Sequence, residues 1–299
     1  MIWPEIFTAL ITPYSSDGSV NGAKAAELAQ HLWGQGSGGF LVAGSTGEAF
    51  GLTLDERKEL FLAVRGALPP QVPVWVGTGT NDTAHTVELT AAADSWGADG
   101  VLIVAPYYNR PTPDGLTAHF VEAAQHTERP VMIYNVPART GVRVSPDVVA
   151  AARRRAPNIT AVKEAGGSVL ALMAMHRELD SDVAIYTGDD ALFLPSLAVG
   201  ARGVVSVASH VAAADMAALA EHFRAGRTED AVRMAESLAP LIESLFSLSN
   251  PIPLKWLLNR LGWQVGSVRL PLTMPDDRVL APLWSHYTAL HQQSAAAGA

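Results

Sequence analysis

The sequence predicts an α/β protein: a closed (β/α)8 TIM barrel followed by a C-terminal helical extension. Three observations support this prediction. Short apolar runs alternate with stretches of helical periodicity, eight such runs occur in the first 225 residues, and none follows Phe223. Near-continuous apolar strands joined by helices are typical of a parallel sheet covered on both faces, and eight repeats are enough to close a barrel. An open, doubly wound sheet is the alternative.

The predicted strands are short runs rich in β-branched and apolar residues. In chain order they cover 6–11, 39–43, 74–77, 101–105, 131–135, 159–163, 183–187 and 203–207. The intervening segments predict crossover helices, among them 22–36, 54–68, 83–96 and 117–126. Further helices are expected over 228–247, 251–261 and 276–292. We therefore expect two regions, a barrel of residues 1–225 and a helical region of residues 226–299.

Composition excludes several classes of protein. The chain has 299 residues, of which 48% are hydrophobic and 17% charged, so it can bury a large core. A formal net charge of −8 argues against a nucleic acid or an anionic membrane as partner. The absence of cysteine excludes disulfides and thiolate chemistry. Because neither a basic, apolar leader nor an apolar stretch of membrane-spanning length is present, we expect a cytoplasmic protein.

Unusual polar residues come directly after the predicted strands. A parallel barrel builds its functional site from these loops, so we expect the side chains to meet at one rim. The segments are Gly44–Glu48, Gly77–Asn81, Pro106–Pro111, Tyr134–Gly141, Lys163–Glu164 and Gly188–Asp190.

Lys163 carries the sharpest chemical signal. It closes the apolar run that begins at Ile159, and a lysine removed from water there favours the neutral, nucleophilic amine that Schiff-base chemistry requires. A buried ion pair is the structural alternative. Lys255, which lies in a proline-rich segment, is expected to have such a structural role as the partner of a carboxylate.

Neighbouring residues supply functions that a Schiff-base lysine needs. Tyr134 ends the adjacent strand and could move protons. Ser45 and Thr46, flanked by glycines, offer hydroxyl and backbone N–H groups to a small carboxylate. Arg139 could bind a second carboxylate or pin its own loop. A serine nucleophile elbow is disfavoured because Ala43 replaces the first glycine of that motif.

The sequence contains no other recognisable catalytic or cofactor-binding motif. The chain contains neither a phosphate-binding loop nor a complete dinucleotide fingerprint, and no metal-binding cluster is apparent, so we expect no cofactor and no metal. His119 and His126 lie seven residues apart on a predicted helix and are expected at the surface.

With these residues in hand, the sequence resembles the pyruvate-dependent class I aldolases of the N-acetylneuraminate lyase superfamily, and within it the dihydrodipicolinate synthase (4-hydroxy-tetrahydrodipicolinate synthase) family. The resemblance runs nearly end to end, and the segments Tyr107–Pro111 and Pro137–Gly141 are its most selective motifs. It implies a lyase that condenses pyruvate with L-aspartate 4-semialdehyde to 4-hydroxy-tetrahydrodipicolinate, in diaminopimelate and lysine biosynthesis. The alternatives are an N-acetylneuraminate lyase or hydroxy-oxo-acid aldolase, and a catalytically silent binding barrel.

The resemblance also implies a role for each residue. Lys163 would form the Schiff base with pyruvate, and Ser45, Tyr134 and Tyr108 would relay protons. The remaining binding positions are Thr46 for the pyruvate carboxylate, Arg139 for the semialdehyde carboxylate, and Gly188 and Val205 for backbone contacts. In this family the residue at Tyr108 reaches into the neighbouring subunit, which implies a homodimer as the minimum unit and a homotetramer as the usual assembly.

Two features of the sequence depart from the family pattern. Ser45 stands where the synthases usually have threonine, which keeps the hydroxyl but loses a methyl group. The pocket where some members bind lysine as a feedback inhibitor aligns with Ala49, Leu54, Arg57, Asn81, His85 and Tyr107. Since His85 replaces a glutamate of lysine-sensitive enzymes and Arg57 adds positive charge, we predict weak or absent inhibition by lysine.

Overall fold

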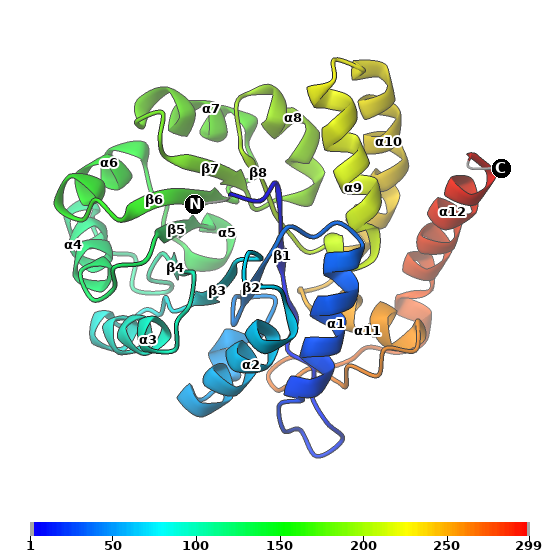
Figure 1. Cartoon of the computed structure of the whole chain (residues 1–299), viewed down its shortest axis with the longest axis horizontal. Helices are drawn as coiled ribbons and strands as arrows, with labels where there is room; N and C mark the ends of the chain where they lie inside the picture. The colour runs from blue at the N-terminus through cyan, green and yellow to red at the C-terminus, as the bar shows by residue number, and fades with distance from the viewer. Residues whose placement is uncertain (1–2, 298–299) are drawn as a thin grey trace.

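The computed structural model describes residues 3–297, with side chains to residue 292, and its centre is a closed parallel barrel (Figure 1). Each strand pairs with the next, and β1 closes the ring by pairing with β8. The strands are β1 (Ile6–Ala9), β2 (Gly39–Val42), β3 (Val74–Gly77), β4 (Gly100–Val104), β5 (Val131–Asn135), β6 (Ile159–Glu164), β7 (Ala184–Thr187) and β8 (Gly203–Ser206). The predicted (β/α)8 barrel is confirmed, and the open sheet is excluded.

Helices surround the barrel and continue beyond it. Around the strands lie α1 (Gly22–Gly34), η1 (Ala49–Gly51), α2 (Leu54–Ala67), α3 (Thr83–Ser95), α4 (Pro113–Ala124), α5 (Pro137–Thr140), α6 (Pro146–Arg155), α7 (Val169–Glu178), η2 (Asp190–Leu192), α8 (Phe193–Ala198) and α9 (Ser209–Arg224). The helical extension is formed by α10 (Thr228–Leu245), α11 (Ile252–Arg260), η3 (Asp277–Val279) and α12 (Ala281–Ala297). It gathers on one side of the barrel, at the right in Figure 1.

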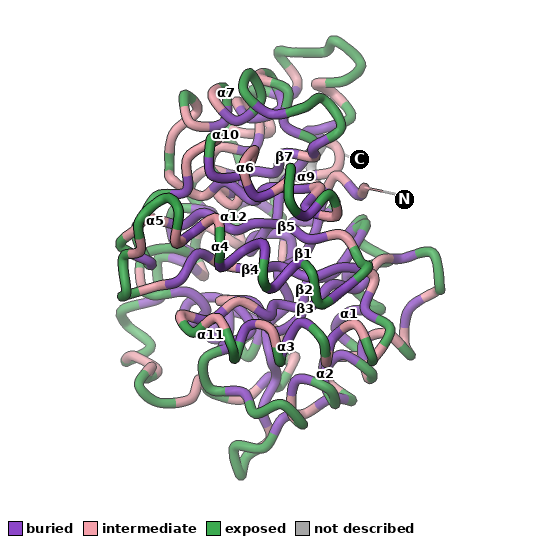
Figure 2. Tube along the Cα trace, turned by 90° about the vertical axis from the view of Figure 1, so that its left-hand side faces the viewer, coloured by how far each residue is buried: buried purple, intermediate pink, exposed green. Residues whose placement is uncertain are grey.

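Strand alternation divides the apolar side chains into two cores. Side chains on one face of the strands, such as Leu41, Leu102 and Met132, fill the inside of the barrel. The opposite face packs against the surrounding helices, and the strands are accordingly buried along most of their length (Figure 2). Since successive side chains of a strand point to opposite faces, the residue two positions beyond an inward-facing one also faces inward.

Local sequence explains where the helices begin. The side chain of Thr53 caps α2 in a capping box with Glu56. The Thr112 side chain caps α4, and Pro113 occupies its first turn, so this helix begins four residues before the predicted 117. The last predicted helix, 276–292, is divided into η3 and α12, with Asp276 capping the short turn.

One surface prediction was wrong. His119 is only 4% exposed, because it lies on the inner face of α4, where its Nδ1 is 2.9 Å from Thr83 Oγ1 of α3. Burial lowers the pKa of His119 to about 4. His126, in contrast, is exposed, as expected. Of the helices in the described part of the chain, none combines the length and the apolar character that crossing a membrane requires.

Candidate active site

The polar loops identified in the sequence converge at the carboxyl ends of the strands. In the pairing of β5 with β6, Tyr134 stands directly opposite Lys163. Met132 and Ala161, two positions earlier on the same strands, belong to the core inside the barrel. Tyr134 and Lys163 therefore both point inward near the rim, on adjacent strands, as the sequence predicted.

The Lys163 side chain is buried but unpaired. It is 6% exposed, and its Nζ lies 4.2 Å from the centre of the Tyr134 ring. Among the residues that the structure describes, no hydrogen bond or ion pair engages this amine. Because no carboxylate among these residues holds the Lys163 ammonium group, the amine is available for nucleophilic chemistry once it is neutral.

A neighbouring carboxylate is held away from this amine. Glu164 follows Lys163 and therefore points to the other face of β6. Its Oε2 accepts a hydrogen bond from Asn135 Nδ2 at 2.7 Å, and its Oε1 accepts one from the Gly166 N–H at 2.7 Å. Burial raises the pKa of the Glu164 carboxyl, and these two hydrogen bonds oppose the shift. No sequence pattern marks this network, since strand spacing alone does not reveal which polar groups pair.

The loop after β2 forms one wall of a small cavity beside Tyr134. Ser45 is half-buried and lines this cavity, while Thr46 is 3% exposed and lies outside the lining. The other lining residues are Ala43, Gly44, Ala49, Phe50, Gly77, Gly79, Leu102 and Val104. A Cβ at Gly79 would lie 2.3 Å from the Val104 backbone nitrogen, so close packing of the strand ends requires glycine here.

Tyr108 lies on the loop between β4 and α4, and Arg139 lies in α5, within the connection that follows β5; neither lines this cavity. The backbone N–H of Tyr108 donates to the Thr140 carbonyl at 3.1 Å, which ties the two loops together. Tyr108 has φ of 72° and is 88% exposed, so a strained backbone presents this ring to the outside of the chain. Arg139 is also exposed, and no ion pair with another described residue pins its guanidinium.

Gly188 and Val205 complete the set of predicted site residues. Gly188 packs against Lys163, since a Cβ at position 188 would lie 2.6 Å from Lys163 Cε. Val205 of β8 is buried in the core inside the barrel. The structure thus brings Lys163, Tyr134 and Gly188 into one place, and Ser45 lines the same small cavity as Tyr134.

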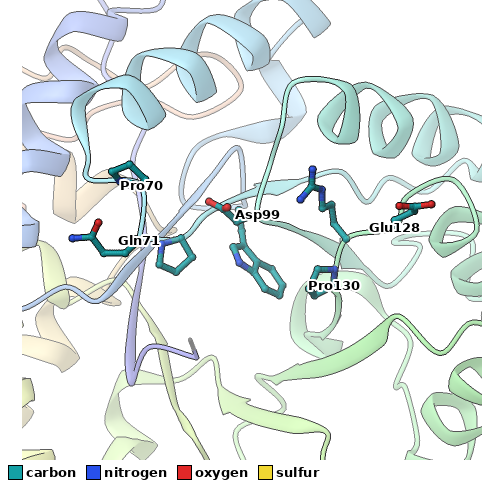
Figure 3. A pocket seen from close by; sticks show the side chains of 8 residues that line it. Pro70, Gln71, Asp99, Glu128 and Pro130 are labelled. Carbon is teal, nitrogen blue, oxygen red and sulfur yellow. The ribbon is translucent and has the colours of Figure 1, made fainter. Parts of the chain in front are cut away.

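Two further features concern metal binding and a second hollow in the barrel. Within the part of the chain that the structure describes, no three His, Asp or Glu side chains gather as metal ligands would. A larger hollow of about 340 Å³ lies at the opposite end of the barrel, around Asp99, Glu128 and Pro130 (Figure 3). Apart from Trp75 of β3, its residues precede β3, β4 and β5, so it is remote from Lys163, at the face where barrel residues contribute stability.

Comparisons with known proteins find relatives along nearly the whole chain. The model of the Dihydrodipicolinate synthetase family matches residues 3–283. The chain is 43% identical to the 4-hydroxy-tetrahydrodipicolinate synthase of Desulforamulus reducens over 96% of its own length and 97% of the relative's. Among solved structures, it resembles the synthase from Cyanidioschyzon merolae with lysine bound, with a TM-score of 0.94, 40% identity, and 96% and 98% of the two chains covered. It also resembles the Acinetobacter baumannii dihydrodipicolinate synthase complexed with pyruvate. The TM-score is 0.92 and the identity 34%, with 97% of this chain and 99% of that chain covered.

Proposed function

The chain belongs to the dihydrodipicolinate synthetase family, and we propose that it is a 4-hydroxy-tetrahydrodipicolinate synthase that condenses pyruvate with L-aspartate 4-semialdehyde. The observation that carries the proposal is the buried, unpaired amine of Lys163, 4.2 Å from the Tyr134 ring at the barrel rim. The product serves diaminopimelate and lysine biosynthesis, which fits a cytoplasmic location.

Lys163 performs the covalent chemistry. Its neutral amine attacks the keto carbon of pyruvate, and loss of water from the resulting carbinolamine gives an iminium ion. Removal of a methyl proton converts the iminium into an enamine, whose carbon attacks the aldehyde of the second substrate. The amino group of that substrate then attacks the iminium carbon, closes the ring and releases the lysine. Because the lysine supplies the electron sink, the reaction requires no metal or other cofactor.

Three hydroxyl groups move the protons for these steps. Tyr134 lies beside the Lys163 amine, and Ser45 lines the same small cavity as Tyr134. Tyr108 completes the relay from a second copy of the chain, which is consistent with its outward-facing ring. The minimum active unit is therefore a homodimer, and pairing of dimers gives a homotetramer.

The substrate carboxylates are bound by the loops around the rim. Thr46 and Ser45 hold the pyruvate carboxylate through hydroxyl and backbone N–H groups. Arg139, exposed on α5, binds the carboxylate of aspartate semialdehyde. Backbone groups of Gly188 and Val205 complete the pocket.

Borohydride trapping tests the Schiff base. Incubation with pyruvate and borohydride should add one reduced pyruvate unit to Lys163, as located by peptide mass spectrometry. Lys163→Ala should abolish the adduct, whereas replacement of the exposed Lys58 by alanine should not. An adduct located elsewhere, or no adduct, would refute the assignment.

Turnover of pyruvate with aspartate semialdehyde, coupled to reduction of the cyclic product, tests the overall reaction. Tyr134→Phe should keep the fold and lose about 10²–10⁴ in rate, as is typical when an acid–base group is removed. Faster turnover of a sugar acid or a hydroxy-oxo-acid than of the proposed pair would assign the chain to another branch of the superfamily.

A further inference from the structure

The C-terminal extension contacts the Gly44–Glu48 loop through two buried polar links. Asn250, just before α11, donates a hydrogen bond from Nδ2 to Thr46 Oγ1 at 2.8 Å. Lys255, on α11, places its Nζ 2.6 Å from Glu48 Oε1. All four side chains are at least nine-tenths buried. The extension therefore reaches across about two hundred residues of sequence to hold a loop of the proposed active site.

Lys255 and Glu48 fix the end of this loop. The Lys255 amine also donates to the Ser267 carbonyl at 2.8 Å and lies 4.0 Å from the centre of the Tyr14 ring. The second carboxylate oxygen of Glu48 accepts a hydrogen bond from the Arg269 N–H at 2.8 Å. Glu48 has a left-handed backbone with φ of 53°, and its carboxylate is held on both sides. The loop is thus anchored before any substrate arrives.

Asn250 determines where the Thr46 hydroxyl can point its proton. A hydroxyl group has one proton to donate and two lone pairs that accept. The Asn250 amide N–H occupies one lone pair, and no other described residue accepts the Thr46 proton. The Thr46 hydroxyl is therefore left as a free donor, as recognition of an anionic oxygen requires.

We propose that Asn250 is a positioning residue that orients the Thr46 hydroxyl to donate to the carboxylate of pyruvate. This inference rests on the proposed function, because it assigns Thr46 to the keto-acid subsite. It places part of the control of substrate affinity in the C-terminal extension.

The isosteric variant Asn250→Asp gives the sharpest test. A carboxylate can only accept, so it would capture the Thr46 proton and also repel an anionic substrate. We expect the KM for pyruvate to rise about a hundredfold in Asn250→Asp and about fivefold to tenfold in Asn250→Ala. The smaller rise corresponds to the loss of the one hydrogen bond that orients Thr46 toward the charged substrate. The KM for aspartate semialdehyde and the kcat at saturating pyruvate should change little.

Asn259→Ala is the matched control. Asn259 lies on α11, the helix that Asn250 precedes, and its side chain bonds only within the extension, donating to the Gly266 carbonyl and accepting from the Val265 N–H. Its loss should lower stability without raising the KM for pyruvate. If Asn259→Ala raised the KM for pyruvate as much as Asn250→Ala does, Asn250 would act only through the stability of the extension, and the proposal would be overturned.

A double-mutant cycle with Thr46→Val keeps the test decisive if Asn250→Ala does not fold. Without the Thr46 hydroxyl, Asn250→Asp should raise the KM for pyruvate much less than it does in the wild-type background, since only charge repulsion remains. Equal effects in both backgrounds would contradict the proposal. Failure of the proposed function is distinguishable, because the wild-type protein itself would then form no pyruvate adduct.

Discussion

Replacement of Gly188 by alanine should disable Lys163 while leaving the protein folded. The added Cβ would lie 2.6 Å from Lys163 Cε, 3.0 Å from Lys163 Cγ and 2.8 Å from Ala165 Cβ. Carbon atoms in ordinary contact are separated by about 3.5–4.0 Å, so the lysine chain has to withdraw by about 1 Å. A displacement of about 1 Å in a reacting group costs about 10² in rate. Overpacking of this kind costs about 1–3 kcal/mol of stability, which a barrel of this size can tolerate.

The rate of borohydride trapping with pyruvate measures this effect directly, since it reports attack by the amine before the second substrate enters. We expect Gly188→Ala to form the Lys163 adduct about a hundredfold more slowly than the wild-type protein, with its urea midpoint only modestly lowered. Gly66→Ala is the matched control, because a Cβ at this position in α2 meets no atom within 4 Å. The control should trap pyruvate at the wild-type rate and gain up to about 1 kcal/mol of stability. Wild-type trapping by Gly188→Ala would refute the reasoning.

Three further predictions concern stability and regulation. Lys255→Met should lower the free energy of unfolding by about 3–5 kcal/mol, because it leaves the buried Glu48 carboxylate unpaired. Urea titration measures this loss, the Lys255→Met/Glu48→Gln pair should regain part of it, and an unchanged midpoint would contradict the prediction. Burial lowers the pKa of His119 and His210 from 6.5 to about 4. As the pH falls from about 6.5 to about 4, the unfolded chain therefore binds protons that the folded chain does not, and the free energy of unfolding decreases. This loss of unfolding free energy amounts to up to about 3 kcal/mol per histidine. His119→Gln should therefore make the urea midpoint depend less on pH, and an unchanged pH dependence would show that His119 does not cause the acid destabilisation. Lysine at millimolar concentration should inhibit turnover weakly or not at all, since Arg57, whose guanidinium is fixed by the Gly77 and Ala49 carbonyls, would place a positive charge where the lysine pocket of the family aligns; strong inhibition in a steady-state assay would contradict this.

The barrel was predictable because its strands are buried on both faces. Such strands read as nearly continuous apolar runs, and the predicted 74–77 and 131–135 agree with β3 and β5 at both ends. Predicted boundaries failed where capping decided them, as at the start of α4, where Thr112 and Pro113 begin the helix early. The division into residues 1–225 and 226–299 stays a prediction.

Within the candidate site, the residues at the ends of strands could be predicted from the sequence. Tyr134 and Lys163 were recognisable because each ends an apolar run, and the pairing of adjacent strands brings them together. The burial of His119 was missed, since a helix does not reveal from spacing alone which histidine faces its neighbour. The Asn250–Thr46 hydrogen bond joins residues 204 positions apart, and no periodicity in the sequence marks such a pair.

The two buried lysines show why burial alone does not make a nucleophile. Lys255 is fully buried, and burial lowers its pKa to about 8 although Glu48 opposes the shift. Yet its amine is committed to the Glu48 carboxylate and the Ser267 carbonyl, so it has no direction left from which to attack a carbonyl carbon. Lys163 is nearly as buried, but none of the described residues holds its amine, and the Tyr134 ring lies beside it. In the proposed mechanism, reactivity thus depends on leaving Lys163 without a carboxylate partner while Lys255 has one. The loop that supplies Glu48 to Lys255 also contributes Ser45 to the cavity that Tyr134 lines.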